Sequence, residues 1–209
     1  YDTVRSAIGQ GNHSYTPAGL SRYVTTLANS GTCYNLTLID KTVNPVTGNV
    51  EDNSATVKNK VDISDTTWKY IHKGMRKVIT GGSIDKLYEN VNVDVAGKTG
   101  TAQENDYKPN HALFVSYAPY KNPEISVTTV VPNGYTSGNA AEISRDIYKY
   151  YYHDCLPMIH MLYKNQGKYK LQPLTSFLLQ SARIYQLCFH RCMGDVLLVA
   201  LIHIYRQPA

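Results

Sequence analysis

Hydrophobic positions recur at helical spacing in two segments of the chain. In the first, Thr16 and Pro17 precede apolar residues three and four apart, and Asn29-Ser30-Gly31 follows them. A hydroxyl cap, a first-turn proline and a terminal glycine are typical of helix ends. In the second, Ser64 precedes a similar apolar face that ends at Gly81-Gly82. The pattern therefore predicts two amphipathic helices. The apolar face of the second helix comprises Trp68, Ile71, Met75 and Val78.

Extended runs rich in β-branched residues occupy much of the remaining chain up to residue 152. Two short runs, Leu36 to Val43 and Asn49 to Glu51, flank Asn44-Pro45-Val46-Thr47-Gly48, whose composition is typical of a hairpin loop. A last helix is expected from Ala140 to Tyr151. Between the second and the last helix, proline-containing turns separate three predicted strands: Val91 to Ala102, Ala112 to Tyr117 and Ile125 to Val131.

The order of these elements is helix, hairpin, helix, three strands and helix. Short links, such as that from Pro119 to Pro123, favour antiparallel neighbours, because a parallel crossover needs a dozen residues or more. We therefore predict an α+β fold in which helices pack on an antiparallel sheet.

The composition changes abruptly after Tyr152. Residues 1–152 contain 15 basic and 14 acidic residues, whereas residues 153–209 contain 6 basic and 2 acidic ones. We interpret residues 1–152 as one folded unit and residues 153–209 as a tail of unknown structure. The tail could be a further layer of the fold, a membrane-surface segment or an out-of-frame translation, and the abrupt change favours the last. Its apolar run from Val196 to Tyr205 is too short to span a bilayer.

Overall composition excludes several classes of protein. With 209 residues, 43% of them hydrophobic and 18% charged, the chain is typical of a globular protein rather than a disordered one. The net charge is +5, but the basic residues form no cluster or reader motif, so nucleic acid is not an expected partner. Cys188 and Cys192 have a metal-like spacing, yet only His190 and the distant Cys155 could complete a site. No metal or cofactor is expected.

The first residues, Tyr1-Asp2-Thr3, lack an initiator methionine and the basic and apolar regions of a signal peptide. We therefore expect any export signal to lie upstream of this sequence. No uninterrupted apolar stretch of transmembrane length occurs in the chain, so the sequence predicts no clear membrane-spanning helix.

The segment Gly97-Lys98-Thr99-Gly100-Thr101-Ala102-Gln103 lies at the end of the first of the three strands. Each residue type has a chemical use there. A lysine presents a fixed positive charge to an anionic substrate, threonine hydroxyls bond a carboxylate, and a glycine lets a ligand lie close along the strand. The backbone N–H of the residue after that glycine can contribute to an oxyanion hole. Lys-Thr-Gly on a strand is one of three motifs shared by penicillin-binding proteins and serine β-lactamases.

The segments around this motif resemble class B penicillin-binding proteins, especially the penicillin-binding protein 2 group. Ile8-Gly9-Gln10-Gly11-Asn12 and the first predicted helix precede the motif as they do in that family. His111 to Pro119, Asn122-Pro123-Glu124-Ile125 and Ser144-Arg145-Asp146-Ile147 follow it in the family's order. The resemblance covers about residues 1–152 and implies the C-terminal part of a transpeptidase domain, with part of the penicillin-binding protein/serine β-lactamase-like fold.

The resemblance implies a peptidoglycan D,D-transpeptidase, which cross-links stem peptides through a serine acyl-enzyme and is acylated by β-lactams. It implies an extracytoplasmic protein with an upstream membrane anchor, and cell-elongation membrane proteins as partners besides stem peptides and β-lactams. Carried onto this sequence, Lys98 would contribute to the electrostatics and proton network of catalysis. The N–H of Thr101 would form half of the oxyanion hole. Thr99 and Thr101 would bind the substrate carboxylate, beside Gly100, which leaves room for the substrate.

Two short matches depart from the family's pattern. Ser83-Ile84-Asp85-Lys86 spells the nucleophile motif Ser-x-x-Lys, but it follows a helix stop where the family has the start of a buried helix. Ser137-Gly138-Asn139 spells Ser-x-Asn, but it comes after Lys98 rather than before it, so we interpret it as a turn or helix cap. The nucleophile is therefore expected outside this sequence, and the isolated chain should not turn over substrate. A non-catalytic module that binds peptidoglycan peptides, and a β-lactamase or carboxypeptidase relative, are the alternatives.

Overall fold

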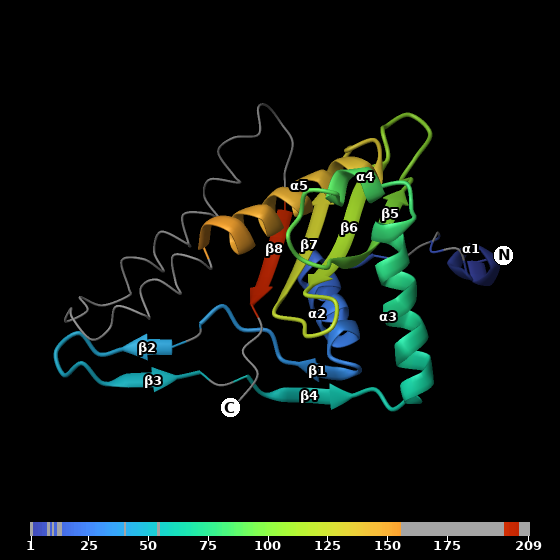
Figure 1. Cartoon of the computed structure of the whole chain (residues 1–209). Coiled ribbons are helices and arrows are strands. Elements are labelled where there is room, and N and C mark those ends of the chain that lie inside the picture. Colours follow the sequence, from blue (N-terminus) through green and yellow to red (C-terminus); the bar gives the residue numbers. More distant parts are fainter. Residues whose placement is uncertain are drawn as a thin grey trace.

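The fold is built around an antiparallel sheet with packed helices, as predicted, and the helices cover both faces of the sheet (Figure 1). The computed structural model describes residues 2–7, 9, 11, 14–39, 41–53, 55–155 and 199–204. Within these residues the main sheet has four strands in the order β5-β6-β7-β8. They are β5 (Ala96–Ala102), β6 (His111–Ala118), β7 (Ile125–Val131) and β8 (Val199–Ile204).

Four helices pack on the two faces of this sheet. α5 (Ser137–Lys149) and the short α4 (Asp85–Tyr88) lie on one face, and α2 (Pro17–Ala28) packs against β6 and β7 on the other. α3 (Asp65–Thr80) runs beside β5, and a short α1 (Asp2–Ala7) lies near the N-terminus (Figure 1). The α+β prediction is therefore confirmed.

The two helices predicted from their caps begin where the sequence indicates. The hydroxyl oxygen of Thr16 accepts a hydrogen bond from the backbone N–H of Gly19 at 3.0 Å, and that of Ser64 accepts one from Thr67 at 3.2 Å. Each cap satisfies one of the amides that the first turn of a helix leaves without an intrahelical partner.

Gly31 ends the α2 region for a packing reason as well as a conformational one. Its φ is 99°, a conformation that favours glycine. A Cβ atom at this position would lie 2.5 Å from the carbonyl oxygen of Val61 and 2.8 Å from the ring of Trp68. The glycine therefore permits the close contact between the end of α2 and the segment that leads into α3.

The apolar core forms one cluster on each face of the sheet. On the α5 face, the fully buried members include Phe114, Ile125, Val127 and Tyr148. On the α2 face, the buried members are Val24, Ala28, Met75, Ala96 and Tyr117. Buried hydroxyl pairs join helix to sheet on both faces, because such groups must find hydrogen-bond partners away from water. They are Thr25 with Ser126 at 3.0 Å and Thr129 with Ser144 at 2.8 Å.

A two-stranded ribbon extends away from the main sheet (Figure 1). β1 (Thr32–Tyr34) pairs with β4 (Val57–Lys60), and β2 (Lys41–Val43) pairs with β3 (Val50–Asp52), both antiparallel. The predicted hairpin loop lies between β2 and β3. The side-chain oxygen of Asn44 accepts hydrogen bonds there from the N–H groups of Val46 at 2.9 Å and Thr47 at 3.0 Å.

Several predicted boundaries are wrong. The strand expected from Leu36 begins only at Lys41, because the Thr37 side chain bonds the backbone of Ile39 on both its N–H and its carbonyl. The strand expected from Val91 begins only at Ala96. The last helix begins at Ser137 rather than at Ala140 and continues beyond Lys149 as a π-helix, η1 (Tyr150–Cys155). Strands β1 and β4 and helices α1 and α4 were not predicted.

Most of the tail lies outside the described residues, including Cys188, His190 and Cys192. Of the described tail residues, 153–155 belong to η1, and Val199–Ile204 pairs antiparallel with β7 from Ile204 opposite Ile125 to Val199 opposite Val130. In the part of the chain that the structure describes, no helix combines the length and apolarity needed to cross a membrane. The same residues contain no group of three or more His, Cys, Asp or Glu side chains that could hold a metal ion.

Candidate substrate-binding strand

The four residues predicted for the site lie together on β5. Lys98 and Thr101 are exposed, and Thr99 and Gly100 are half-buried. Among the described strands β5 pairs only with β6, so its other edge is free of a strand partner. A strand with one free edge offers a row of backbone N–H and C=O groups to an extended ligand. The motif therefore occupies a strand edge at which a peptide can pair.

Two contacts show which backbone groups face the free edge of β5. On the side of β6, the carbonyl oxygen of Asp94 accepts a hydrogen bond from the N–H of Tyr120 at 2.7 Å. On the other side, the Val95 carbonyl accepts from Arg76 of α3, at 2.7 Å. Backbone groups of successive strand residues alternate in direction, so residues 97, 99 and 101 share the direction of residue 95. The N–H of residue 101, predicted for the oxyanion hole, therefore faces the free edge.

Lys98 already contacts this edge through its side chain. Its Nζ donates a hydrogen bond to the carbonyl oxygen of Thr99 at 2.7 Å. The ammonium group thus lies beside the backbone at the point where the carboxylate of a ligand is predicted to bind. A ligand carboxylate can replace this carbonyl as the acceptor, and a charge-assisted bond to a carboxylate is the stronger of the two.

Gly97 is a structural requirement that the sequence motif did not reveal. A Cβ atom there would lie 2.6 Å from the ring of Phe114 and 2.9 Å from the carbonyl oxygen of Val115 on β6. At Gly100 the nearest atom would be the Cβ of Leu113, at 3.3 Å, which is a milder contact. The first glycine therefore fixes the distance between β5 and β6, while the predicted role of Gly100 toward substrate remains a prediction.

The serine residues of the two short matches lie in turn and helix-start positions. Ser83 is exposed in the turn between α3 and α4, as the glycine stop predicted. Ser137 is the first residue of α5, whose N-cap is Thr136. The Asn139 side chain donates to the carbonyl oxygen of Gly134 at 2.8 Å, which closes the turn before the helix. Neither serine lies on β5. The interpretation of Ser83 as a loop residue is confirmed, whereas Ser137 begins α5 itself and the cap is Thr136.

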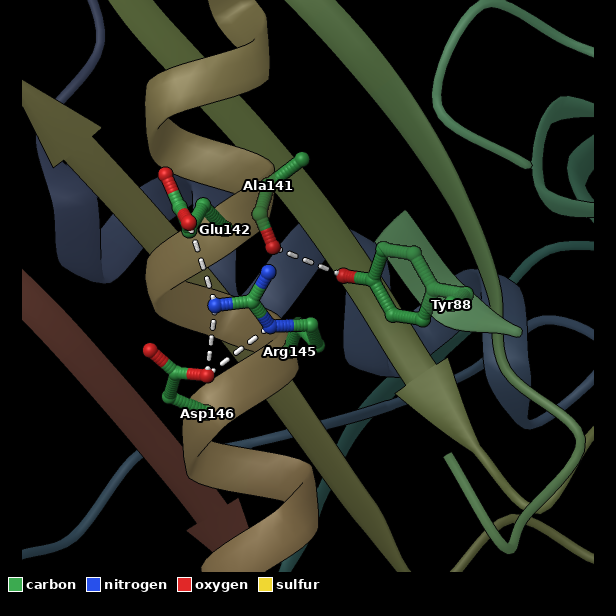
Figure 2. Close-up of polar contacts among 5 residues, drawn as sticks. All are labelled: Tyr88, Ala141, Glu142, Arg145 and Asp146. Atoms are coloured by element: carbon green, nitrogen blue, oxygen red, sulfur yellow. Dashed lines mark hydrogen bonds and ion pairs between the residues drawn. The ribbon is translucent and has the colours of Figure 1, made fainter. Parts of the chain in front are cut away.

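Buried tyrosines hold the helices against the sheet that carries the motif. The hydroxyl of Tyr148 on α5 donates to the hydroxyl of Ser116 on β6 at 3.0 Å, and that of Tyr88 on α4 donates to the carbonyl oxygen of Ala141 at 3.0 Å (Figure 2). Burial raises the pKa of both phenols above the ordinary value, because it disfavours the charged form. Both side chains therefore act as neutral hydrogen-bond donors.

Arg145 belongs to one of the segments that carry the family resemblance, and the structure places it half-buried on α5 rather than on β5. Figure 2 shows its guanidinium between two carboxylates, Glu142 at 3.1 Å and Asp146 at 2.8 Å. Desolvation lowers the pKa of Arg145, but the bonds and charges of Asp146 and Glu142 outweigh it and raise the pKa overall. Arg145 thus stabilises the helix that covers the sheet.

Comparison with known proteins places these observations in a family. The model of the penicillin binding protein transpeptidase domain matches residues 1–149. Peptidoglycan D,D-transpeptidase MrdA of Haemophilus influenzae is 32% identical over 178 residues, which are 76% of this chain and 27% of that protein. Penicillin-binding protein 2B of Streptococcus pneumoniae is 32% identical over 166 residues, which are 71% of this chain and 24% of that protein.

Solved structures agree with the sequence comparison. Penicillin-binding protein 2B of Streptococcus pneumoniae strain R6 superposes with a TM-score of 0.63 at 31% identity, over 73% of this chain and 27% of that one. Pseudomonas aeruginosa PBP2, in complex with WCK 5153, superposes with a TM-score of 0.59 at 28% identity. The match covers 74% of this chain and 34% of that one. The chain spans about a quarter of the length of the curated relatives it matches. It belongs to the penicillin-binding protein transpeptidase family, is of the class B, penicillin-binding protein 2-like kind, and covers part of the transpeptidase domain.

Proposed function

We propose that this chain is the substrate-strand portion of a peptidoglycan D,D-transpeptidase that cross-links stem peptides and is acylated by β-lactams. The observation that carries the proposal is the Lys-Thr-Gly-Thr motif on the free edge of β5, in a chain that belongs to the transpeptidase family. The edge supplies backbone pairing for an extended peptide, and the side chains supply recognition of its carboxylate.

The proposed roles follow from the chemistry of each group. The ammonium of Lys98 attracts the terminal carboxylate of a D-alanyl-D-alanine peptide and takes part in the proton network around the scissile bond. The hydroxyls of Thr99 and Thr101 donate hydrogen bonds to that carboxylate. The N–H of Thr101 stabilises the negative charge that develops on the carbonyl oxygen during acylation.

The nucleophile is proposed to come from polypeptide outside this chain. Acyl transfer needs a serine with a base within hydrogen-bond reach. Ser83 and Ser137 occupy a turn and a helix start away from β5, so neither is proposed as that serine. The chain by itself would then bind peptide without cleaving it. The proposal also makes the whole protein an extracytoplasmic one that is anchored to the cell membrane, and it names cell-elongation membrane proteins as its partners.

A titration of the 15N-labelled chain with diacetyl-L-Lys-D-Ala-D-Ala tests the binding role. We expect amide shifts along residues 98–101, and weaker shifts with the L-Ala-L-Ala peptide. Lys98→Ala and Thr101→Val should each weaken binding about tenfold, the effect of losing one charge-assisted hydrogen bond. Lys77→Ala removes an exposed charge on α3 and serves as the control. Binding that ignores stereochemistry, or that survives both β5 substitutions, would count against the proposal.

Peptide binding combined with labelling by a fluorescent penicillin separates the transpeptidase proposal from the non-catalytic alternative. If a longer product of the same gene binds the peptide but forms no adduct with a fluorescent penicillin, a binding module is the better description. If the longer product is labelled, the transpeptidase proposal stands.

A further inference from the structure

Arg76 of α3 contacts two consecutive residues where the chain enters β5. Its Nη1 donates to the carbonyl oxygen of Val95 at 2.7 Å, and its Nη2 forms a hydrogen-bonded ion pair with the Asp94 carboxylate. The side chain of Arg76 is 24% exposed and that of Asp94 is 61% exposed. From the other side, the N–H of Tyr120 holds the Asp94 carbonyl at 2.7 Å. The backbone is therefore fixed from both sides immediately before the strand begins.

Val95 supplies the first carbonyl on the free edge of β5. Because strand carbonyls alternate in direction, the next ones on this edge belong to residues 97, 99 and 101. The Val95 carbonyl oxygen already accepts a hydrogen bond from the Arg76 guanidinium. A peptide that pairs with β5 therefore cannot use this carbonyl as an acceptor. The strand edge open to a ligand therefore starts at Gly97.

The charges near β5 indicate which end of a ligand lies there. A peptide that pairs antiparallel to β5 has its C-terminus beside the start of the strand. Lys98 places a positive charge near that end, which suits a terminal carboxylate. One residue further, a longer peptide would meet the Arg76 guanidinium and the exposed Asp94 carboxylate, which form a closed ion pair. The bond from Arg76 to the Val95 carbonyl leaves that acceptor unavailable to the N–H of an added residue.

We propose that Arg76, together with Asp94, closes one end of the strand edge and makes the site specific for peptides that end in a free carboxylate beside Lys98. Arg76 is thus a specificity-determining residue that acts by its place at the end of the edge, and it takes no part in the chemistry. This inference rests on the proposed function, since it assumes that a D-alanyl-D-alanine peptide pairs with β5.

The experiment compares two ligands on the full 209-residue chain by amide-shift titration. The first is diacetyl-L-Lys-D-Ala-D-Ala, and the second carries one more C-terminal D-Ala. We expect the unmodified chain to prefer the shorter peptide about tenfold, the discrimination that one added group in a fitted site typically gives. Arg76→Ala should bring the ratio of dissociation constants close to one, because the Val95 carbonyl becomes available to the additional amide.

Three further variants separate specificity from folding. Lys77→Ala, the adjacent exposed lysine on α3, should leave the ratio unchanged. Asp94→Asn keeps the bond from Arg76 to Val95 and should retain the preference. Arg76→Lys keeps the charge but lacks the two-pronged guanidinium, so its ratio should be intermediate. This variant provides the test if the alanine variant does not fold. Thermal melts of each variant show whether a change in ratio reflects unfolding.

The outcomes distinguish this inference from the function on which it rests. If the unmodified chain binds neither peptide, the proposed function fails and the inference fails with it. If the chain binds both peptides equally, the inference alone is overturned. The inference is also overturned if folded Arg76→Ala still prefers the shorter peptide, or if Arg76→Lys shows the same ratio of dissociation constants as the unmodified chain. Discrimination that is lost on Arg76→Ala and kept on Lys77→Ala and Asp94→Asn supports it.

Discussion

At the scale of single residues, Gly97 shows how packing constrains the motif strand. A methyl group there would overlap the Phe114 ring and the Val115 carbonyl, and the latter belongs to backbone that cannot rotate away. We expect Gly97→Ala to lower the free energy of unfolding by about 2 kcal/mol, in the range for overpacking a filled core.

Urea denaturation measures this change, and Gly74 provides a matched control. Gly74 lies within α3, and a Cβ atom there would meet nothing within 4 Å. Gly74→Ala should therefore stabilise the chain by up to about 1 kcal/mol through helix propensity. Equal effects of the two substitutions would contradict the packing argument.

Three buried tyrosines make the free energy of unfolding depend on pH. Burial raises the pKa of Tyr148, Tyr88 and Tyr117 in the folded chain, whereas the unfolded phenols ionise near pH 10. The unfolded chain therefore loses protons that the folded chain keeps, and the free energy of unfolding falls as the pH rises above about 10. Below that pH both states are protonated, and these groups contribute no pH dependence.

Substitution of Tyr148 tests this linkage. Each such tyrosine contributes a slope of about 1.4 kcal/mol per pH unit between its unfolded and folded pKa values. Tyr148→Phe should remove one such contribution to the slope. At neutral pH it should also lower the free energy of unfolding by about 1 kcal/mol, because the hydrogen bond to Ser116 is lost. Denaturation curves at pH 8 and pH 11 measure both effects. Exposed Tyr107→Phe is the control and should change neither.

At the scale of elements, β7 depends on partners along both edges. Six of its seven residues are buried, and it pairs with β6 on one edge and β8 on the other. We expect a chain that ends at Cys155 to show faster hydrogen exchange at the β7 amides, because their outer hydrogen-bond acceptors are gone. Exposure of this apolar edge should also promote association between chains.

Hydrogen exchange of the 1–155 and 1–209 chains, measured by mass spectrometry, makes the comparison. The β5 and β6 amides that bond each other serve as internal controls and should keep their protection. Unchanged protection of β7 would mean that β8 adds nothing to the sheet, and it would favour the interpretation of residues 153–209 as a separate tail.

At the scale of the whole molecule, the position of the serines leads to a prediction about acylation. The 209-residue chain should form no covalent adduct with benzylpenicillin, since the nucleophile is proposed to lie outside it. Intact-mass measurement after incubation with benzylpenicillin checks this, and Ser83→Ala is the matched variant. An adduct that disappears in Ser83→Ala would show that the turn serine is reactive and would overturn the proposed division of the site.

Local signals predicted most helix and strand positions, because caps, turn residues and β-branched runs act over a few residues. Thr16, Ser64 and the Asn44 loop behave as their types predict. The Lys98 to Thr101 motif and its family were also identified from the sequence, since order and residue type carry that information. Boundaries were less accurate where a local side chain, such as Thr37, competes with strand pairing.

The tertiary structure decided what depends on contacts between distant residues. No local pattern indicates that Arg76 meets Val95, that Gly97 must fit beneath Phe114, or that β8 pairs with β7. Such contacts join residues between 17 and more than 70 positions apart, and they arise only when helices and strands pack together. The sequence by itself therefore determined most of the longer elements, the motif and the family, whereas packing determined which edge of β5 is free and where that edge ends.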